Sequence, residues 1–156
     1  IAPLAGILRL AEKFGAEVIV DEAHGLAVYG RNNKEDLVLS YSNSPQLLET
    51  ESKIPQYELQ NNHGGTGVLA ALNLENHPAL LASVHTFGKG AGCHGAIVCS
   101  SAVLRQYLWN YSRPFIYSTA LPLHSLVTIR SSYETFIGLE GDRKREDVFI
   151  LVRYFR

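Results

Sequence analysis

Near its N-terminus the chain carries the pattern that most restricts its fold, an amphipathic helix followed by a short apolar strand. Apolar residues recur at helical spacing across 4–11, and Gly15 stands where a left-handed residue commonly ends a helix. Residues 17–21 are mostly β-branched, which is typical of a parallel strand buried on both faces, and the run ends in charge at Asp21. This order is the repeat of an α/β sheet, whose ligands bind outside the carboxyl ends of the strands. We therefore expect a site near residues 21–24.

The rest of the chain alternates between predicted strands and helices. Three further segments have the length and composition of strands, namely 82–86, 95–99 and 115–118. Four segments have helical spacing or helix-start signals, namely 68–73, the run after Ser100 or Ser101, the run from Pro122 towards Gly138, and 142–156. Residues 31–65 are polar, contain Pro45 and Pro55 and keep no period, which indicates a loop or an insertion. The pattern predicts an α/β fold with a mostly parallel sheet flanked by helices.

Charge and hydropathy exclude several classes of protein. A formal net charge of -1 leaves no basic excess for a run of phosphates, so nucleic-acid binding is not expected. No apolar run approaches the roughly 20 residues that cross a bilayer, and a soluble, cytoplasmic protein is expected. Cys93 and Cys99 lack the spacing of metal ligands, so we assign them no metal or redox role. The chain starts without Met and ends inside a helical run, and we expect it to be a fragment.

A lysine between two glycines, in the run Gly88-Lys89-Gly90, is the most unusual local feature. Because glycine disfavours regular elements and lets other groups approach the backbone, we expect something to dock there. A phosphate-binding P-loop requires a glycine five residues before the glycine-lysine pair and a hydroxyl after the lysine. Ser83 and Gly90 occupy those positions, so a P-loop is excluded. A solvated loop lysine stays open as the simpler interpretation.

A lysine that binds an aldehyde cofactor covalently fits the run better than a P-loop does. Pyridoxal phosphate (PLP) is such a cofactor, and it accepts electrons from the substrate's α-carbon most readily when its ring nitrogen is protonated. A carboxylate beside that nitrogen keeps the proton in place. Asp21, at the end of a predicted buried strand, suits this role. A helix cap or a turn residue remains the alternative for Asp21.

Three motifs, in this order along the chain, carry a family resemblance. They are VDEAHG at 20–25, VHTFGKG at 84–90 and RPFIYSTALP at 113–122. The chain resembles the α-oxoamine synthases, a PLP-dependent family of the aminotransferase-like fold (PLP fold type I), over nearly its whole length outside 31–65. The resemblance implies that residues 1–122 belong to the PLP-binding large domain. Residues 123–156 would then form a connecting helix and the start of the C-terminal small domain.

The resemblance also implies a role for each residue of the motifs. Lys89 would hold the cofactor and move protons at the substrate's α-carbon, and Asp21 would pair with the pyridine nitrogen. His24 would bind the phenolic oxygen and act in catalysis, with a satisfied loop histidine as the alternative. Thr86 would bind the phosphate. Ser118 and Thr119 would reach a phosphate across a homodimer interface with shared active sites.

The family joins an amino acid to an acyl-CoA with loss of CO2. The residues of the second and third motifs most resemble those of the branch that uses L-alanine and a pimeloyl thioester in biotin synthesis. Members that use glycine are the nearest alternative, followed by a non-catalytic subunit of the same fold and by a different PLP enzyme such as a β-eliminating lyase. The long polar stretch at 31–65 departs from the family, in which a short glycine-rich connection joins the first two motifs.

Overall fold

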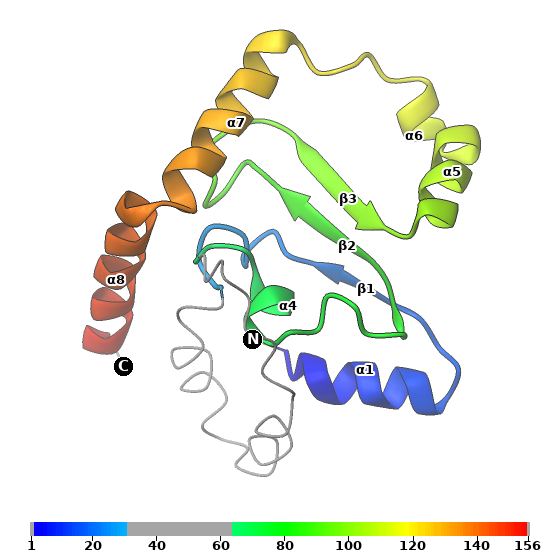
Figure 1. The fold of residues 1–156 in the computed structure, drawn as a ribbon, viewed down its shortest axis with the longest axis horizontal. Coiled ribbons are helices and arrows are strands. Elements are labelled where there is room, and N and C mark those ends of the chain that lie inside the picture. Colours follow the sequence, from blue (N-terminus) through cyan, green and yellow to red (C-terminus); the bar gives the residue numbers. More distant parts are fainter. Residues whose placement is uncertain (1, 31–63, 156) are drawn as a thin grey trace.

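The computed structural model describes residues 2–30 and 64–155. Most of the predicted insertion, residues 31–63, lies outside the described residues. The described strands are β1 (Val18–Asp21), β2 (Leu80–Thr86) and β3 (Ala96–Ser100), and they form one sheet in the order β1-β2-β3 (Figure 1). The three strands predicted at 17–21, 82–86 and 95–99 are therefore confirmed, and β2 begins two residues earlier than expected.

The sheet is mixed in direction. β1 pairs with β2 in parallel, whereas β2 and β3 are antiparallel, with Ser83 opposite Cys99 and Thr86 opposite Ala96. A parallel pair needs a crossover connection of about a dozen residues or more, and residues 87–95 are too few for one. These residues turn the chain back on itself instead. Because they include Lys89, the same short connection that reverses the third strand also carries the lysine.

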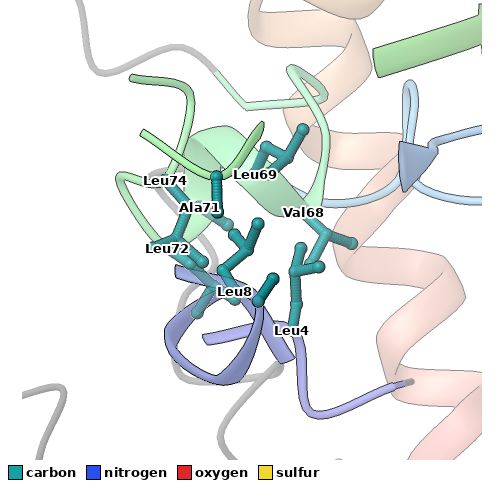
Figure 2. Close-up of a cluster of buried hydrophobic side chains, with 9 residues drawn as sticks. Leu4, Leu8, Val68, Leu69, Ala71, Leu72 and Leu74 are labelled. Atoms are coloured by element: carbon teal, nitrogen blue, oxygen red, sulfur yellow. The ribbon is translucent and has the colours of Figure 1, made fainter. Parts of the chain in front are cut away.

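Two helices form a core against one face of the sheet (Figure 2). Leu4 and Leu8 of α1 (Leu4–Lys13) pack against α4 (Val68–Ala71) and the residues after it, and Leu8 is fully buried. Gly15 follows α1 in the left-handed region, with φ of +65°, which confirms the predicted helix end. α4 is confirmed as a helix but ends earlier than the predicted 68–73.

β1 is not buried on both faces in the described part of the chain. Val18 and Val20 pack against the core of α1 and α4, whereas the side chain of Ile19 is 62% exposed. Alternate residues of a strand point to opposite faces, so only one face of β1 is covered by described residues. The β-branched run correctly indicated a parallel strand, but it did not by itself determine the burial.

The fourth predicted strand, residues 115–118, is wrong. The chain first forms α5 (Ala102–Tyr111), where the Ser101 hydroxyl accepts a hydrogen bond from the Leu104 N–H at 3.2 Å, as expected of an N-cap. It then forms the short helix α6 (Arg113–Ile116). Pro114 lies in the first turn of α6, where its missing N–H has no intrahelical partner to lose. The aromatic and β-branched content of 115–118 suggested a strand, and the helix-start signal of the proline outweighed it.

Two long helices complete the described chain, α7 (Leu123–Phe136) and α8 (Leu139–Tyr154), and both were predicted. Their contact with the loops of the sheet depends on Arg145, whose side chain is 6% exposed. Its guanidinium donates to the carbonyls of Phe136 at 2.6 Å and Ala27 at 3.3 Å and pairs with Asp142. Arg145 thereby joins α8 to α7 and to the segment that follows β1. The proposed domain boundary at 122/123 stays a prediction.

No helix among the described residues is both long and apolar enough to cross a membrane.

Replacing Arg145 by Met should destabilise the protein by about 2–4 kcal/mol, because the buried carbonyls of Ala27 and Phe136 lose their charged donor. Urea unfolding of the natural protein and the variant measures the change. Arg143→Met is the matched control, since Arg143 is an exposed neighbour on the same helix, and it should change the free energy of unfolding by less than about 0.5 kcal/mol. Equal effects of the two substitutions would contradict the structural role of Arg145.

Candidate active site

Two loops meet at the carboxyl ends of β1 and β2. The first follows Asp21, and its turn is closed by hydrogen bonds from the N–H groups of Gly25 and Leu26 to the carbonyl of Glu22, both at 2.9 Å. The second spans residues 87–95 and is closed by the Phe87 N–H, which donates to the carbonyl of Gly95 at 2.9 Å. Because the two strands are parallel neighbours, their loops leave the same edge of the sheet. This edge is the expected place for a ligand.

Lys89 and His24 are brought together at this edge. The distance from Lys89 Nζ to His24 Nε2 is 3.0 Å, and both residues are exposed to solvent. They are 65 residues apart in the chain, so the contact results from the parallel pairing of β1 and β2. An amine and an imidazole at this distance can share one proton, with the direction of donation set by the tautomer of the ring. The pair has the reach and the chemistry for proton transfer.

The glycines around Lys89 differ in their surroundings. A β-carbon on Gly90 would lie 2.7 Å from the carbonyl oxygen of Leu26 and 3.1 Å from Cβ of Ala27. Only glycine therefore lets the lysine loop approach the loop after β1 so closely. Gly88 has no such neighbour, since the nearest atom to its added β-carbon would be the Cys93 carbonyl oxygen at 3.9 Å. The close approach expected from the Gly-Lys-Gly run thus occurs at Gly90.

Asp21 and Thr86 lie on the same face of the sheet. Asp21 is the pairing partner of Val84, and Thr86 is two residues further along β2, so strand alternation puts all three side chains on one face. One Asp21 oxygen, Oδ1, accepts a hydrogen bond from the Ala23 N–H at 2.8 Å, and the residue remains exposed. The hydroxyl oxygen of Thr86 is buried and has no hydrogen-bond partner among the described residues. A buried hydroxyl without a partner is uncommon and is suited to a ligand oxygen.

Glu22, which the sequence placed near the site, turns into the core instead. It is 2% exposed, and its two carboxylate oxygens accept hydrogen bonds from the N–H groups of Val68 at 2.9 Å and Leu69 at 2.7 Å. It therefore caps the start of α4 from a distant point in the chain. Gly25 and Gly67 pack closely against the carboxylate, since an added β-carbon would lie 1.9 Å and 2.9 Å from its oxygens. Glu22 supports the loop that carries His24, and both of its oxygens are buried and hydrogen-bonded to the backbone of α4.

His85 and Ser83 lie on the opposite face of β2 from Thr86. The Ser83 hydroxyl is 2.9 Å from His85 Nε2, and Nδ1 of His85 is buried without a partner among the described residues. Burial lowers the pKa of His85 below its usual value, an effect that the nearby carboxylates of Glu22 and Asp21 partly offset. The folded protein therefore favours the neutral imidazole.

Lowering the pH should destabilise the protein through His85. The folded-state pKa lies below the unfolded value of about 6.5, so the unfolded chain takes up a proton first as the pH falls. Stability from this group is complete above about pH 6.5 and declines as the pH drops below it. Denaturant unfolding across this range should show a flatter pH dependence for His85→Gln. His124→Gln, at an exposed position on α7, should leave the profile unchanged, and a profile unaltered by His85→Gln would contradict the prediction.

Ser118 and Thr119 lie away from Lys89. β3 runs antiparallel to β2, so the helices after β3 begin at the end of the sheet opposite the lysine loop, and Figure 1 shows α5 and α6 there. Ser118 follows α6 and donates a hydrogen bond to the carbonyl of Pro114. No hydrogen bond joins Ser118 or Thr119 to the other predicted site residues in the described chain. Their role in binding a phosphate across a homodimer interface therefore stays a prediction.

The two cysteines are free, and within residues 2–30 and 64–155 there is no group of three or more acidic, histidine or cysteine side chains that could hold a metal ion. The candidate site instead combines an amine, an imidazole, a carboxylate and an unpartnered hydroxyl at one edge of a sheet. These groups suit PLP, whose aldehyde, pyridine nitrogen, phenolic oxygen and phosphate require an amine, a carboxylate and hydrogen-bond donors.

Comparison with known proteins assigns the chain to a family. Residues 1–148 match the aminotransferase class I and II family. The chain belongs to this family, and its α/β fold is that of the PLP fold type I enzymes. PLP is the cofactor that the family and its solved structures indicate.

Within the family, the chain is similar to α-oxoamine synthases. It is 33% identical to the 8-amino-7-oxononanoate synthase of Cupriavidus metallidurans over 159 aligned residues, which cover 100% of the chain and 30% of that protein. It is 40% identical to the enzyme of the same name from Emericella nidulans over 92 residues, covering 59% of the chain and 22% of that protein. The chain thus spans about 30% or less of the length of these relatives.

Solved structures give the same relationship. A structure of SPT with PLP has a TM-score of 0.62 and 27% identity, covering 94% of the chain and 28% of that protein. The 8-amino-7-oxononanoate synthase of Francisella tularensis has a TM-score of 0.59 and 26% identity, covering 93% of the chain and 32% of that protein. The family resemblance inferred from the three motifs is confirmed, and so is the predicted fold class.

Proposed function

We propose that this chain provides the lysine-bearing part of an 8-amino-7-oxononanoate synthase, which joins L-alanine to a pimeloyl thioester with loss of CO2 in biotin synthesis. The observation that carries the proposal is the 3.0 Å contact between Lys89 and His24, formed at the edge of the sheet where Asp21 and Thr86 share a face. The names of the most similar relatives support the choice of reaction within the family.

Each polar group of the site has a role in this proposal. When bound, PLP supplies an electron sink for negative charge at the amino acid's α-carbon. Lys89 Nζ would hold the cofactor covalently and, once the substrate's amine has taken its place, would remove and return the proton at that carbon. Its contact with His24 Nε2 holds the amine towards the site and gives the proton a second acceptor. His24 also donates to the cofactor's phenolic oxygen.

Asp21 and Thr86 hold the two ends of the cofactor. The Asp21 carboxylate keeps the pyridine nitrogen protonated, and its bond from the Ala23 N–H orients it at the end of β1. The Thr86 hydroxyl donates to the phosphate, which satisfies an oxygen that has no partner among the described residues. Both residues are at the ends of strands, so the sheet sets the distance between them.

We further propose that the active protein is a homodimer with shared sites. Ser118 and Thr119 lie beyond the end of the sheet opposite Lys89, so they are suited to a phosphate held by a second copy. Several large apolar side chains near them are exposed in the described chain, namely Trp109, Tyr111, Phe115, Ile116 and Tyr117. A dimer interface would remove this apolar surface from water.

Product analysis of the natural protein tests the proposed reaction. Purified protein is incubated with PLP, pimeloyl-CoA and either L-alanine, glycine or L-serine, and the products are identified by mass spectrometry. We expect 8-amino-7-oxononanoate with alanine and little product with the other two amino acids. Because serine palmitoyltransferase (SPT) is among the similar solved structures, a different amino acid substrate is the second candidate. A preference for serine or glycine would overturn the choice of L-alanine but would leave the family assignment unchanged.

A further inference from the structure

The loop that carries Lys89 is anchored by a helix more than 30 residues later in the chain. The hydroxyl of Ser132, on α7, donates a hydrogen bond to the carbonyl of Ala91, two residues after Lys89. The same helix packs against the start and the middle of the loop. Tyr133 meets the ring of Phe87 edge-on at 5.9 Å, and Phe136 shares a buried cluster with Phe87 and Ala91.

Within the loop, the hydrogen bonds are local. The Gly92 N–H donates to the carbonyl of Lys89 at 2.9 Å, and the Cys93 N–H donates to the carbonyl of Phe87 at 2.8 Å. These bonds close the loop on itself. Among the described residues, the Ser132 hydroxyl makes the only hydrogen bond from another element to the backbone of residues 88–92.

The loop needs an external anchor because four of its residues are glycines, at 88, 90, 92 and 95. Glycine has more backbone freedom than any other residue, and ordering it costs more conformational entropy. Gly92 already has a φ of +63°, which a residue with a side chain adopts only with strain. A single hydrogen bond to Ala91 therefore restricts the backbone on the C-terminal side of Lys89, and with it the direction of the lysine side chain.

Other hydroxyls on α7 do not make such a bond. Thr128 donates to the carbonyl of His124 at 2.8 Å, and Thr135 donates to the carbonyl of Ser131 at 3.0 Å, so both are used within the helix. Ser131 is adjacent to Ser132 and lines the same 470 Å³ cavity between α7, α8 and the lysine loop, yet it has no hydrogen bond to the loop. The anchor is therefore specific to position 132.

We propose that Ser132 is a positioning residue, which acts through the Ala91 carbonyl to hold Lys89 at the angle needed for covalent attachment of the cofactor. The proposal rests on the proposed function, since it concerns the same lysine. It extends the active site to a helix that none of the three sequence motifs includes.

The test compares three variants of the natural protein: Ser132→Ala, Ser132→Thr and the matched control Ser131→Ala. Hydrogen exchange of the cofactor-free protein reports on the loop through the amides of Gly92 and Cys93. The rate at which PLP attaches to Lys89 is followed by absorption and by borohydride trapping. We expect Ser132→Ala to speed exchange at these two amides roughly two- to tenfold and to slow attachment by a similar factor, which corresponds to the loss of one net hydrogen bond. Ser132→Thr keeps the hydroxyl and should restore both, and Ser131→Ala should change neither.

The outcomes separate this inference from the proposed function. If the natural protein attaches PLP and Ser132→Ala matches Ser131→Ala in exchange and attachment, the positioning role is overturned alone. A lower melting temperature for Ser132→Ala without a change at Gly92, Cys93 or the attachment rate would also overturn it, because that result describes a purely structural hydroxyl. If the natural protein does not attach PLP at Lys89, the proposed function fails, and faster exchange in Ser132→Ala would then support the anchor but not its role in cofactor binding.

Discussion

Replacement of Lys89 by Ala should abolish covalent binding of PLP and reduce turnover by roughly 10²–10⁴-fold or more, the range for loss of a positioned proton-transfer group. The reason is chemical, because no other amine is placed beside His24 among the described residues. Lys89→Arg sharpens the test, since a guanidinium keeps the charge and much of the length but does not attack a carbonyl. Borohydride reduction followed by peptide mass spectrometry should locate the cofactor on residue 89 in the natural protein and nowhere in either variant.

Lys13 provides the matched control for this experiment. It is an exposed lysine at the end of α1, just before the amino end of β1, whereas both loops of the site leave the carboxyl ends of their strands. Lys13→Ala should leave the absorption of the bound cofactor and the turnover unchanged. Covalent attachment that survives in Lys89→Ala, or that is lost equally in Lys13→Ala, would show that the cofactor is held elsewhere.

Replacement of Glu22 by Ala should destabilise the protein by about 2–5 kcal/mol, the largest stability effect we expect of any residue near the site. The substitution leaves the buried N–H groups of Val68 and Leu69 without an acceptor and opens a cavity beside Gly25 and Gly67. Glu22→Gln should have an intermediate effect, because its amide keeps one acceptor oxygen and replaces the other by a donor. Denaturant unfolding measures the three free energies.

Glu17→Ala is the control for Glu22, since Glu17 is an exposed carboxylate just before β1. It should change the free energy of unfolding by less than about 0.5 kcal/mol. Glu22→Ala should also weaken cofactor binding, because the loop that Glu22 supports carries His24. A stable Glu22→Ala protein with normal cofactor binding would show that the start of α4 finds another acceptor, and the capping role would then be wrong.

Local sequence patterns predicted most helices and three strands correctly, because their signals act over a few residues. The periodicity of 4–11, the cap at Ser101 and the start of α7 after Pro122 each depend on near neighbours. The strand predicted at 115–118 failed for a similar reason. Two local signals competed there, and the proline in the first turn of α6 outweighed the strand-forming side chains.

The chemical groups of the site could also be predicted from the sequence, because a family's motifs keep residue types in a fixed order. Asp21, His24, Thr86 and Lys89 were all named from the motifs, and the fold brings His24 to Lys89 across 65 residues. What the motifs did not reveal is which polar residues support the site. Glu22 lies within the stretch 21–24 where a site was expected but binds the backbone of α4 instead, and Arg145 and Ser132 had no local signal for the carbonyls that they bind.

The sequence by itself determined the class of fold, the family and the chemical groups of the candidate site, since these follow from short patterns and from residue identity. The tertiary structure alone decided the direction of β3, the inward turn of Glu22 and the anchoring of the lysine loop by α7. The direction of β3 follows from the short connection at 87–95, and the other two depend on which distant backbone groups are left in need of a partner once the sheet has formed. A buried N–H or carbonyl must be satisfied wherever it lies, and only the folded chain shows which side chain can reach it.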